Sequence, residues 1–285
     1  MCFRTNQSLH KVISSALRIS YDTTGLPCSR TQECASDFLT KNAMVSWTIW
    51  NIVNPKNTQE FPMVRDSFKI YDLPSAWVLV RTLFEGYVNM NYLLIDRVSN
   101  EERKFRLDFW DRHALLERKK MAISIGSQHK KLGVDKKQID EYTKSIRDSK
   151  YFKALPPSKQ QSFMHMDGWT DTGTIQRADK ANIHRSQSEF IFKFCSNYAH
   201  SESYALMQIH AVRSAEEAQR LRRLPMSFTE MFLSLTLRLF AKLQPAAESM
   251  IEGDQDLVGA IDFWEGLKTK NLKQLLTKNG IASGT

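Results

Sequence analysis

Apolar residues near the end of the chain recur at the spacing of one face of an α-helix. They follow the i, i+3, i+4 spacing of one helical face: Phe228, Met231, Phe232, Leu235, Leu239 and Leu243. A helix with such a stripe must bury it against other elements, which requires a packed core. Breakers are scarce, with 11 Gly and 8 Pro in 285 residues, and no segment alternates as a strand does. The sequence therefore predicts an all-α multi-helix bundle.

We expect the whole chain, residues 1–285, to form a single helical domain with its core in about 31–245. Residues 148–175 contain a Pro-Pro pair and show little regular pattern, so they are predicted to be an irregular insertion. Residues 254–278 carry apolar positions at helical spacing and predict a C-terminal helix.

Composition places weak limits on the partners of the chain. Lys plus Arg number 40 against 31 Asp plus Glu, which favours a polyanion such as nucleic acid or a nucleotide phosphate. Acids and bases alternate almost everywhere, however, so charge alone first indicates an ordinary protein surface. The four cysteines include no CxxC pair and predict reduced thiols, with no bound metal and no cofactor. Because the N-terminus lacks the pattern of a signal peptide, we expect a cytoplasmic protein.

Residues 73–95 are long and apolar enough to suggest a bilayer span, but polar groups interrupt them. Arg81, Glu85, Asn89 and Tyr92 fall at i, i+4, i+8 and i+11, on one stripe of a helix. Charges near the centre of a span are costly, so we expect a buried helix and no membrane partner. Arg81 and Glu85 would then have to satisfy each other or a third group. The stripe is either an internal salt bridge or one wall of a polar cleft.

A second polar group gathers at the end of the apolar segment 190–206. Its members are Lys193, Ser196, Asn197, Tyr198 and His200. Lys193, Ser196 and His200 lie at i, i+3 and i+7, which puts them on one helical face. An isolated histidine on a helix is usually structural, but this clustering makes a functional site equally plausible. We expect residues 81–85 and 193–200 to face one cavity.

The two segments resemble those of an uncharacterised bacterial all-helical family. Arg81-Thr-Leu-Phe-Glu85 matches its Arg-x-x-x-Glu, and Phe192-Lys193-Phe-Cys-Ser196-Asn-Tyr-Ala-His200 matches its Arg/Lys-x-x-Ser-x-x-x-His. The second segment also resembles the signature of the HEPN superfamily, an Arg followed after a short gap by His. Lys193 stands where that signature has Arg, and a lysine lacks the planar fork that grips a phosphate. Arg177 and His184 fit the bare spacing too, and we interpret them as a chance match.

The resemblance implies a HEPN-like core with extra helices and a metal-independent ribonuclease that acts as a homodimer. It implies His200 as general base or acid and Lys193 as the group that stabilises a charged phosphorane. Ser196, Asn197 and Tyr198 would position phosphate or base, and Arg81, Glu85 and Asn89 would form the pocket. Many HEPN proteins serve in toxin–antitoxin and antiphage systems, so the resemblance also implies a defence or toxin effector with a cognate antitoxin or regulatory protein.

Because Lys193 stands where the HEPN signature has Arg, a second hypothesis stays open. The chain would then be a non-catalytic helical binding or interaction protein that keeps a degenerate HEPN-like site. Cleavage of RNA that depends on His200 separates the two hypotheses.

Overall fold

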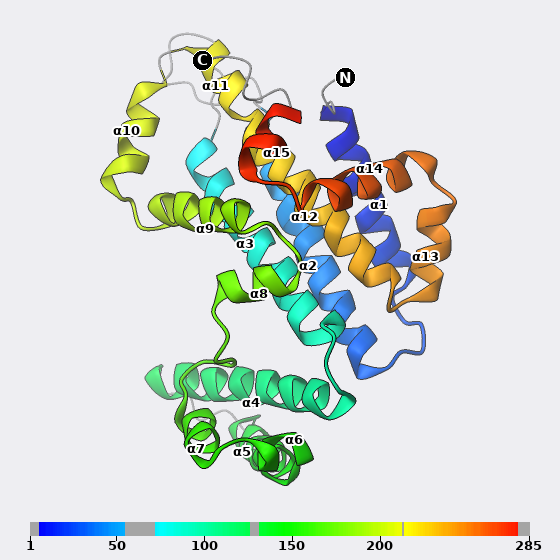
Figure 1. The fold of residues 1–285 in the computed structure, drawn as a ribbon, viewed down its shortest axis with the longest axis vertical. Helices are drawn as coiled ribbons and strands as arrows, with labels where there is room; N and C mark the ends of the chain where they lie inside the picture. Colours follow the sequence, from blue (N-terminus) through cyan, green and yellow to red (C-terminus); the bar gives the residue numbers. More distant parts are fainter. Residues whose placement is uncertain (1–5, 55–71, 126–130, 213, 279–285) are drawn as a thin grey trace. The chain divides into compact units, whose positions relative to one another are not determined.

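The computed structural model describes residues 6–54, 72–125, 131–212 and 214–278. Every regular element among these residues is a helix, which confirms the predicted all-α multi-helix fold (Figure 1). The chain divides into two compact units: unit 1 comprises Met1–Tyr92 and Thr174–Thr285, and unit 2 comprises Leu93–Gly173. Two compact units can belong to one folding domain, so the predicted single domain stays a prediction.

Unit 1 holds the helices that precede and follow unit 2 in the sequence. These are α1 (Asn6–Asp22), α2 (Arg30–Val53), α3 (Leu73–Met90), α8 (Thr174–Lys180), α9 (Arg185–Ala199), α10 (Ser203–Ala211), α11 (Ala215–Leu221), α12 (Arg223–Ala241), α13 (Pro245–Glu252), α14 (Gln255–Leu267) and α15 (Leu272–Lys278). A short π-helix, η2 (Asn91–Ile95), continues α3.

The helix α12 forms the centre of unit 1, where it contacts α1, α2, α3, α13 and α14 (Figure 1). Five residues of the predicted apolar stripe are buried on it: Phe228, Met231, Phe232 and Leu235 fully, and Leu239 with 2% exposed. Leu243, the last residue of that stripe, follows the end of α12 and is half-buried. Phe232 packs against Phe84 of α3 with ring centroids 5.5 Å apart. Burial of such aromatic side chains is the main source of stability in a helical core.

A polar contact ties three helices together inside this core. Asn42 of α2 is fully buried, and its amide donates a hydrogen bond of 2.9 Å to the Thr236 hydroxyl of α12. Asn42 also lies directly against Gly86 of α3, so closely that a Cβ at Gly86 would clash with its amide group. Glycine therefore permits the close approach of α3 to α2.

The core of unit 1 extends beyond the predicted limits of about 31–245. Ile13 and Ile19 of α1 are fully buried, and Trp264 of α14 is 1% exposed.

The predicted C-terminal helix 254–278 is two helices, α14 and α15, rather than one. Asn271 explains the break, because its side-chain oxygen accepts a hydrogen bond of 2.9 Å from the backbone of Gln274 and so starts a new helix.

Unit 2 contains α4 (Asn100–Ser124), α5 (Lys131–Asp148), α6 (Lys150–Ala154) and α7 (Pro157–His165). Its core is an apolar cluster of Phe105, Phe109, Ile146, Phe152 and Phe163. Residues 148–175, predicted to be irregular, include the two short helices α6 and α7. Ser149 caps α6 through its hydroxyl, and α7 begins at a proline, which needs no backbone donor there.

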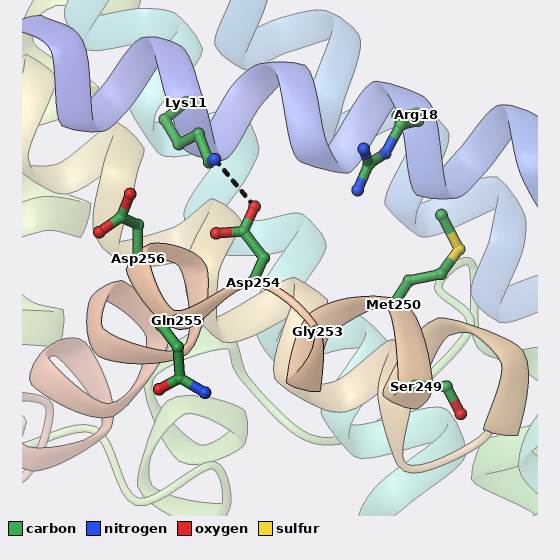
Figure 2. A pocket seen from close by; sticks show the side chains of 8 residues that line it. All are labelled: Lys11, Arg18, Ser249, Met250, Gly253, Asp254, Gln255 and Asp256. Atoms are coloured by element: carbon green, nitrogen blue, oxygen red, sulfur yellow. Dashed lines mark ion pairs between the residues drawn. The ribbon is translucent and has the colours of Figure 1, made fainter.

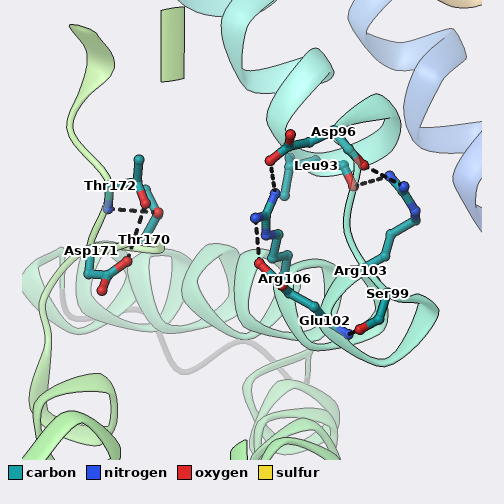
Figure 3. A network of polar contacts seen from close by, with 9 residues as sticks. All are labelled: Leu93, Asp96, Ser99, Glu102, Arg103, Arg106, Thr170, Asp171 and Thr172. Atoms are coloured by element: carbon teal, nitrogen blue, oxygen red, sulfur yellow. Dashed lines mark hydrogen bonds and ion pairs between the residues drawn. The ribbon is translucent and has the colours of Figure 1, made fainter. Parts of the chain in front are cut away.

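A network of charges joins the segment after α3 to α4 within unit 2 (Figure 3). Arg106 is 5% exposed, and its guanidinium donates a hydrogen bond of 2.9 Å to Asp96 and another to Glu102. Arg103 donates one of 2.8 Å to the backbone carbonyl of Asp96. Ser99 begins α4, because its hydroxyl accepts from the Glu102 backbone at 3.1 Å.

No described helix has the length and apolar character that crossing a bilayer requires.

Candidate functional site

The two polar segments singled out in the sequence meet where α3 and α9 pack against each other. Trp77 of α3 and Phe194 of α9 anchor the contact, with ring centroids 4.6 Å apart and the rings nearly perpendicular. Ile191 and Cys195 of α9 are fully buried. This packing fixes the register of the two helices and so decides which polar groups face each other.

Arg81 is the residue that links the two segments. Its Nε donates a hydrogen bond of 3.0 Å to Glu85 Oε1, one turn along α3, and its Nη1 donates one of 2.9 Å to Ser196 Oγ on α9. The guanidinium carbon also lies 4.5 Å from the centroid of the Phe192 ring, within reach of a cation–π interaction. Three contacts thus hold the Arg81 guanidinium in one orientation.

The ion pair is only half-buried, which corrects the expectation of a fully buried pair. The Arg81 side chain is 23% exposed and the Glu85 side chain 35% exposed. The stripe lies at the edge of the α3–α9 contact, where water still reaches it. Water screens the pair, so it contributes less to stability than a buried pair does, and its polar atoms stay accessible to a ligand.

Ser196 and His200 occupy successive turns at the end of α9. The Ser196 hydroxyl accepts from Arg81 and donates to the Phe192 carbonyl, while the His200 backbone N–H donates to the Ser196 carbonyl at 3.0 Å. His200 is the last residue of the helix turn, and Ser201 follows with a φ of 53° that reverses the chain. The His200 and Lys193 side chains are exposed on α9.

The remaining predicted residues take different positions. Asn197 is half-buried, and its amide donates to the Lys193 carbonyl at 3.0 Å. Tyr198 stacks beside Trp77 with ring centroids 6.4 Å apart, and burial raises the pKa of its hydroxyl to about 12. Asn89 is half-buried, with a side-chain oxygen that has no hydrogen-bond partner among the described residues. The geometry therefore joins Arg81, Glu85 and Ser196 by hydrogen bonds and leaves the exposed groups of α9 beside them.

Arg177, which the sequence alone indicated as a chance match, belongs to the same region. It lies on α8, which contacts both α3 and α9, and its side chain is 7% exposed. Burial lowers the pKa of its guanidinium, while the neighbouring Tyr92 and Glu85 raise it. The spacing to His184 was the one signal for Arg177 in the sequence, and it says nothing of Glu85, which only the fold brings near.

The charge balance around Glu85 is positive, since Arg81 and Arg177 both act on this one carboxylate. Such a balance suits an anionic ligand such as a phosphate group. Among the described residues no group of three or more His, Cys, Asp or Glu side chains is placed to hold a metal ion.

A surface hollow of about 530 Å³ lies elsewhere, between α1 and the α13–α14 turn (Figure 2). It is lined by Lys11, Arg18, Ser249, Met250, Gly253, Asp254, Gln255 and Asp256, none of which belongs to the predicted site. Lys11 pairs with Asp254 at 3.0 Å, and Asp254 also caps α14 by accepting from Leu257. These contacts account for Asp254 as a structural residue.

Fold and site together define a class of protein. It is an all-helical protein in which a half-buried cluster of Arg81, Glu85 and Ser196 joins two helices that are distant in the sequence. The chain belongs to a family of unknown function, DUF5677, whose model matches residues 66–218. The match includes α3, α8 and α9, and therefore every predicted site residue. It confirms the expected membership of an uncharacterised all-helical family. Neither the curated proteins nor the solved structures include a significant match to the chain.

Proposed function

We propose that the chain is a HEPN-like, metal-independent endoribonuclease of the cytoplasm, with its site at Arg81, Ser196 and His200. The observation that carries the proposal is the hydrogen bond from Arg81 to Ser196. It holds a guanidinium one helical turn from the histidine that ends α9. Cleavage of a phosphodiester without a metal needs a fixed cation and an accessible imidazole that reach the same phosphate, and we expect Arg81 and His200 to do so.

The chemistry assigns a role to each group. The ribose 2′-oxygen attacks the adjacent phosphorus, the bond from phosphorus to the 5′-oxygen breaks, and a 2′,3′-cyclic phosphate forms. His200 accepts the proton of the 2′-hydroxyl or donates one to the departing 5′-oxygen. Arg81 and Lys193 stabilise the negative charge that gathers on the phosphorane. Glu85 and Ser196 orient Arg81 through the two hydrogen bonds described above.

Arg81 can also supply the guanidinium that the HEPN signature has at the position of Lys193. A lysine offers a single ammonium group, whereas a guanidinium presents donors in a planar fork that fits a phosphate. Arg81 supplies such a fork close to the position that Lys193 occupies on α9. The substitution of Lys for Arg in the second motif is therefore compatible with catalysis.

The helix that follows His200 supports the predicted homodimer. Four apolar side chains of α10 are largely exposed: Tyr204 at 45%, Leu206 at 55%, Met207 at 68% and Ile209 at 45%. Apolar clusters of this kind mark surfaces that another protein covers. A second copy on α10 would bring a second His200 close to the first, and a cognate antitoxin or regulatory protein of a defence or toxin effector would compete for the same surface.

A non-catalytic binding protein is the second candidate, and one observation favours it. The Arg81 guanidinium already has two hydrogen-bond partners, and the Ser196 hydroxyl both accepts and donates. A cluster satisfied in this way can serve to hold α3 on α9. In that case the site binds an anion, RNA included, and leaves it intact.

The experiment incubates end-labelled RNA with the full chain in EDTA and compares wild type with His200→Ala. His165→Ala is the matched control, since His165 is an exposed histidine in unit 2. We expect cleavage by wild type and the control, and a loss on the order of 100-fold for His200→Ala. RNA that wild type binds without cleaving supports the second candidate, and equal cleavage by His200→Ala contradicts the first.

A further inference from the structure

Three aromatic rings form a platform on unit 1, where α1 packs against α2. The rings of Trp47 and Trp50 on α2 are stacked at an angle of 13°, with centroids 5.5 Å apart. The imidazole of His10 on α1 lies tilted against both, 5.1 Å from Trp50 and 6.3 Å from Trp47. The ribonuclease proposal uses none of these residues.

Hydrogen bonds fix the part of α2 that carries the platform. The Asn51 amide donates to the Trp47 carbonyl at 2.8 Å, and the Asn54 amide donates to the Trp50 carbonyl at 2.6 Å. Arg222, which precedes α12, donates in turn to the Asn54 side-chain oxygen at 3.0 Å. The two indoles are therefore held in place before any ligand arrives, which lowers the entropic cost of binding.

Trp47 is the outer ring of the platform. It is 41% exposed, whereas Trp50 is half-buried. Trp50 stacks on Trp47, His10 lies tilted against it, and no other ring among the described residues contacts it. Aromatic rings attract each other in offset stacks with centroids about 4.5–7 Å apart. A further flat ring can therefore extend the stack at Trp47.

The surroundings of the platform suit a ligand that carries negative charge. The segments from Asn6 to Ser14 on α1 and from Ala43 to Val53 on α2 contain no Asp or Glu. Lys41 is exposed two turns before Trp47 on α2 and forms no ion pair with any described residue. A protein partner would need a contiguous apolar patch, but Met44 is the only other large apolar side chain exposed on α2.

The packing of α2 on α3 places the platform level with the candidate site. Gly86, near the end of α3, lies against Asn42, whereas the beginning of α3 bonds to α2 through the Ile52 carbonyl. The two helices are therefore antiparallel, and Trp47, midway between Asn42 and Ile52, lies at the level of the stretch of α3 that includes Arg81. Because packed helices lie about 8–10 Å apart, a strand bound at Arg81 can reach Trp47 within a few nucleotides.

We propose that Trp47 stacks on an unpaired base of single-stranded RNA and so holds the substrate beside the cleavage site. Single-stranded RNA is recognised by stacking of its bases on aromatic side chains, while basic groups contact its phosphates. The choice of RNA as the ligand rests on the proposed function. The capacity to stack on a flat ring rests on the geometry of the three rings alone.

The test measures binding of a fluorescently labelled 2′-O-methyl oligouridylate to the full chain by anisotropy. This probe has no free 2′-hydroxyl, so the proposed reaction cannot cleave it. We expect Trp47→Ala to weaken binding about tenfold, and Trp47→Phe, which keeps an aromatic ring, to retain most of the affinity. An abasic oligomer of the same length should bind wild type and Trp47→Ala equally, because it has no base to stack.

Tyr21→Ala is the matched control, since Tyr21 is an aromatic residue of α1 that is 80% exposed and lies outside the platform. It should bind the oligouridylate as wild type does. Circular dichroism checks that each variant is folded, which these exposed positions permit.

Absence of wild-type binding would overturn the proposal, and so would equal binding of the oligouridylate by wild type and Trp47→Ala. Loss of self-association in Trp47→Ala, with binding of the oligouridylate unchanged, would assign the platform to a second copy of the chain instead. Binding that depends on Trp47 in a protein that cleaves no ordinary RNA would refute the ribonuclease proposal and leave this one standing.

Discussion

Arg81 Nη1 donates a hydrogen bond of 2.9 Å to Ser196 Oγ, across 115 positions of sequence. The bond joins α3 to α9 beside the Trp77–Phe194 contact, so apolar packing and polar recognition fix the same register. The same guanidinium holds Glu85. One residue therefore organises every polar contact that connects the two motifs.

The Arg81–Ser196 pair should show a measurable coupling energy. In a double-mutant cycle of Arg81→Ala and Ser196→Ala, we expect a coupling of about 1 kcal/mol in the free energy of unfolding. The value is modest because the Arg81 side chain is 23% exposed and water competes for its donors. Urea unfolding of the four proteins measures it, and strictly additive effects would mean that the bond does not form in solution.

Gly86→Ala should destabilise unit 1 although alanine is the better helix former. The new Cβ meets the buried Asn42, which cannot move without losing its hydrogen bond to Thr236. We expect a loss of about 1–3 kcal/mol in stability. Gly259→Ala on α14 is the control, because its Cβ would meet nothing within 4 Å, and it should be neutral or stabilising by up to about 1 kcal/mol. Thermal unfolding compares them, and equal effects would contradict the close α2–α3 approach.

Arg106→Ala should destabilise unit 2 by about 3–5 kcal/mol, because it removes a buried cation that pairs with both Asp96 and Glu102. Lys137→Ala, at an exposed lysine, should change stability by less than about 0.5 kcal/mol. Hydrogen exchange should show lost protection in residues 93–173. Unchanged protection in that range would show that the network of Figure 3 does not hold the unit together.

The cysteines should differ in their rates of alkylation. Burial raises the pKa of Cys34 to about 11 and that of Cys195 to about 12, whereas Cys28 is exposed. The thiolate is the reactive form, so a raised pKa leaves less of it below pH 9. In a Cys2→Ser background we expect iodoacetamide at pH 8 to modify Cys28 first and the other two only in denaturant. Mass spectrometry identifies the sites, and fast labelling of Cys195 in the native protein would contradict its burial.

Prediction from the sequence was most accurate for helices whose own residues carry a periodic apolar or polar pattern. The stripe from Phe228 to Leu243 identified α12, which ends two residues before Leu243, and the polar stripe from Arg81 identified the side of α3 that meets α9. The boundaries of 254–278 were wrong because the Asn271 cap competes with an otherwise continuous apolar spacing. The helices of 148–175 are short and draw their stability from the Phe105 cluster, which is a tertiary property.

The candidate site, like the fold, was predicted where helical spacing alone sets the positions and missed where packing between helices sets them. Helical spacing placed Lys193, Ser196 and His200 on one side of α9, because spacing is local. The half-exposure of Glu85 and the arrival of Arg177 from α8 depend on how three helices pack, which no local pattern encodes.

The chemistry of the RNA ends shows whether Arg81, Ser196 and His200 form one RNA-cleaving site. We expect wild-type protein in EDTA to leave 2′,3′-cyclic phosphates, resolved by mass spectrometry of a defined oligoribonucleotide. The product should fall by about 100-fold for His200→Ala and should vanish when the 2′-hydroxyl at the cleaved position is replaced by hydrogen. Cleavage of that 2′-deoxy substrate, or cyclic ends produced at the wild-type rate by His200→Ala, would show that these three residues do not form such a site.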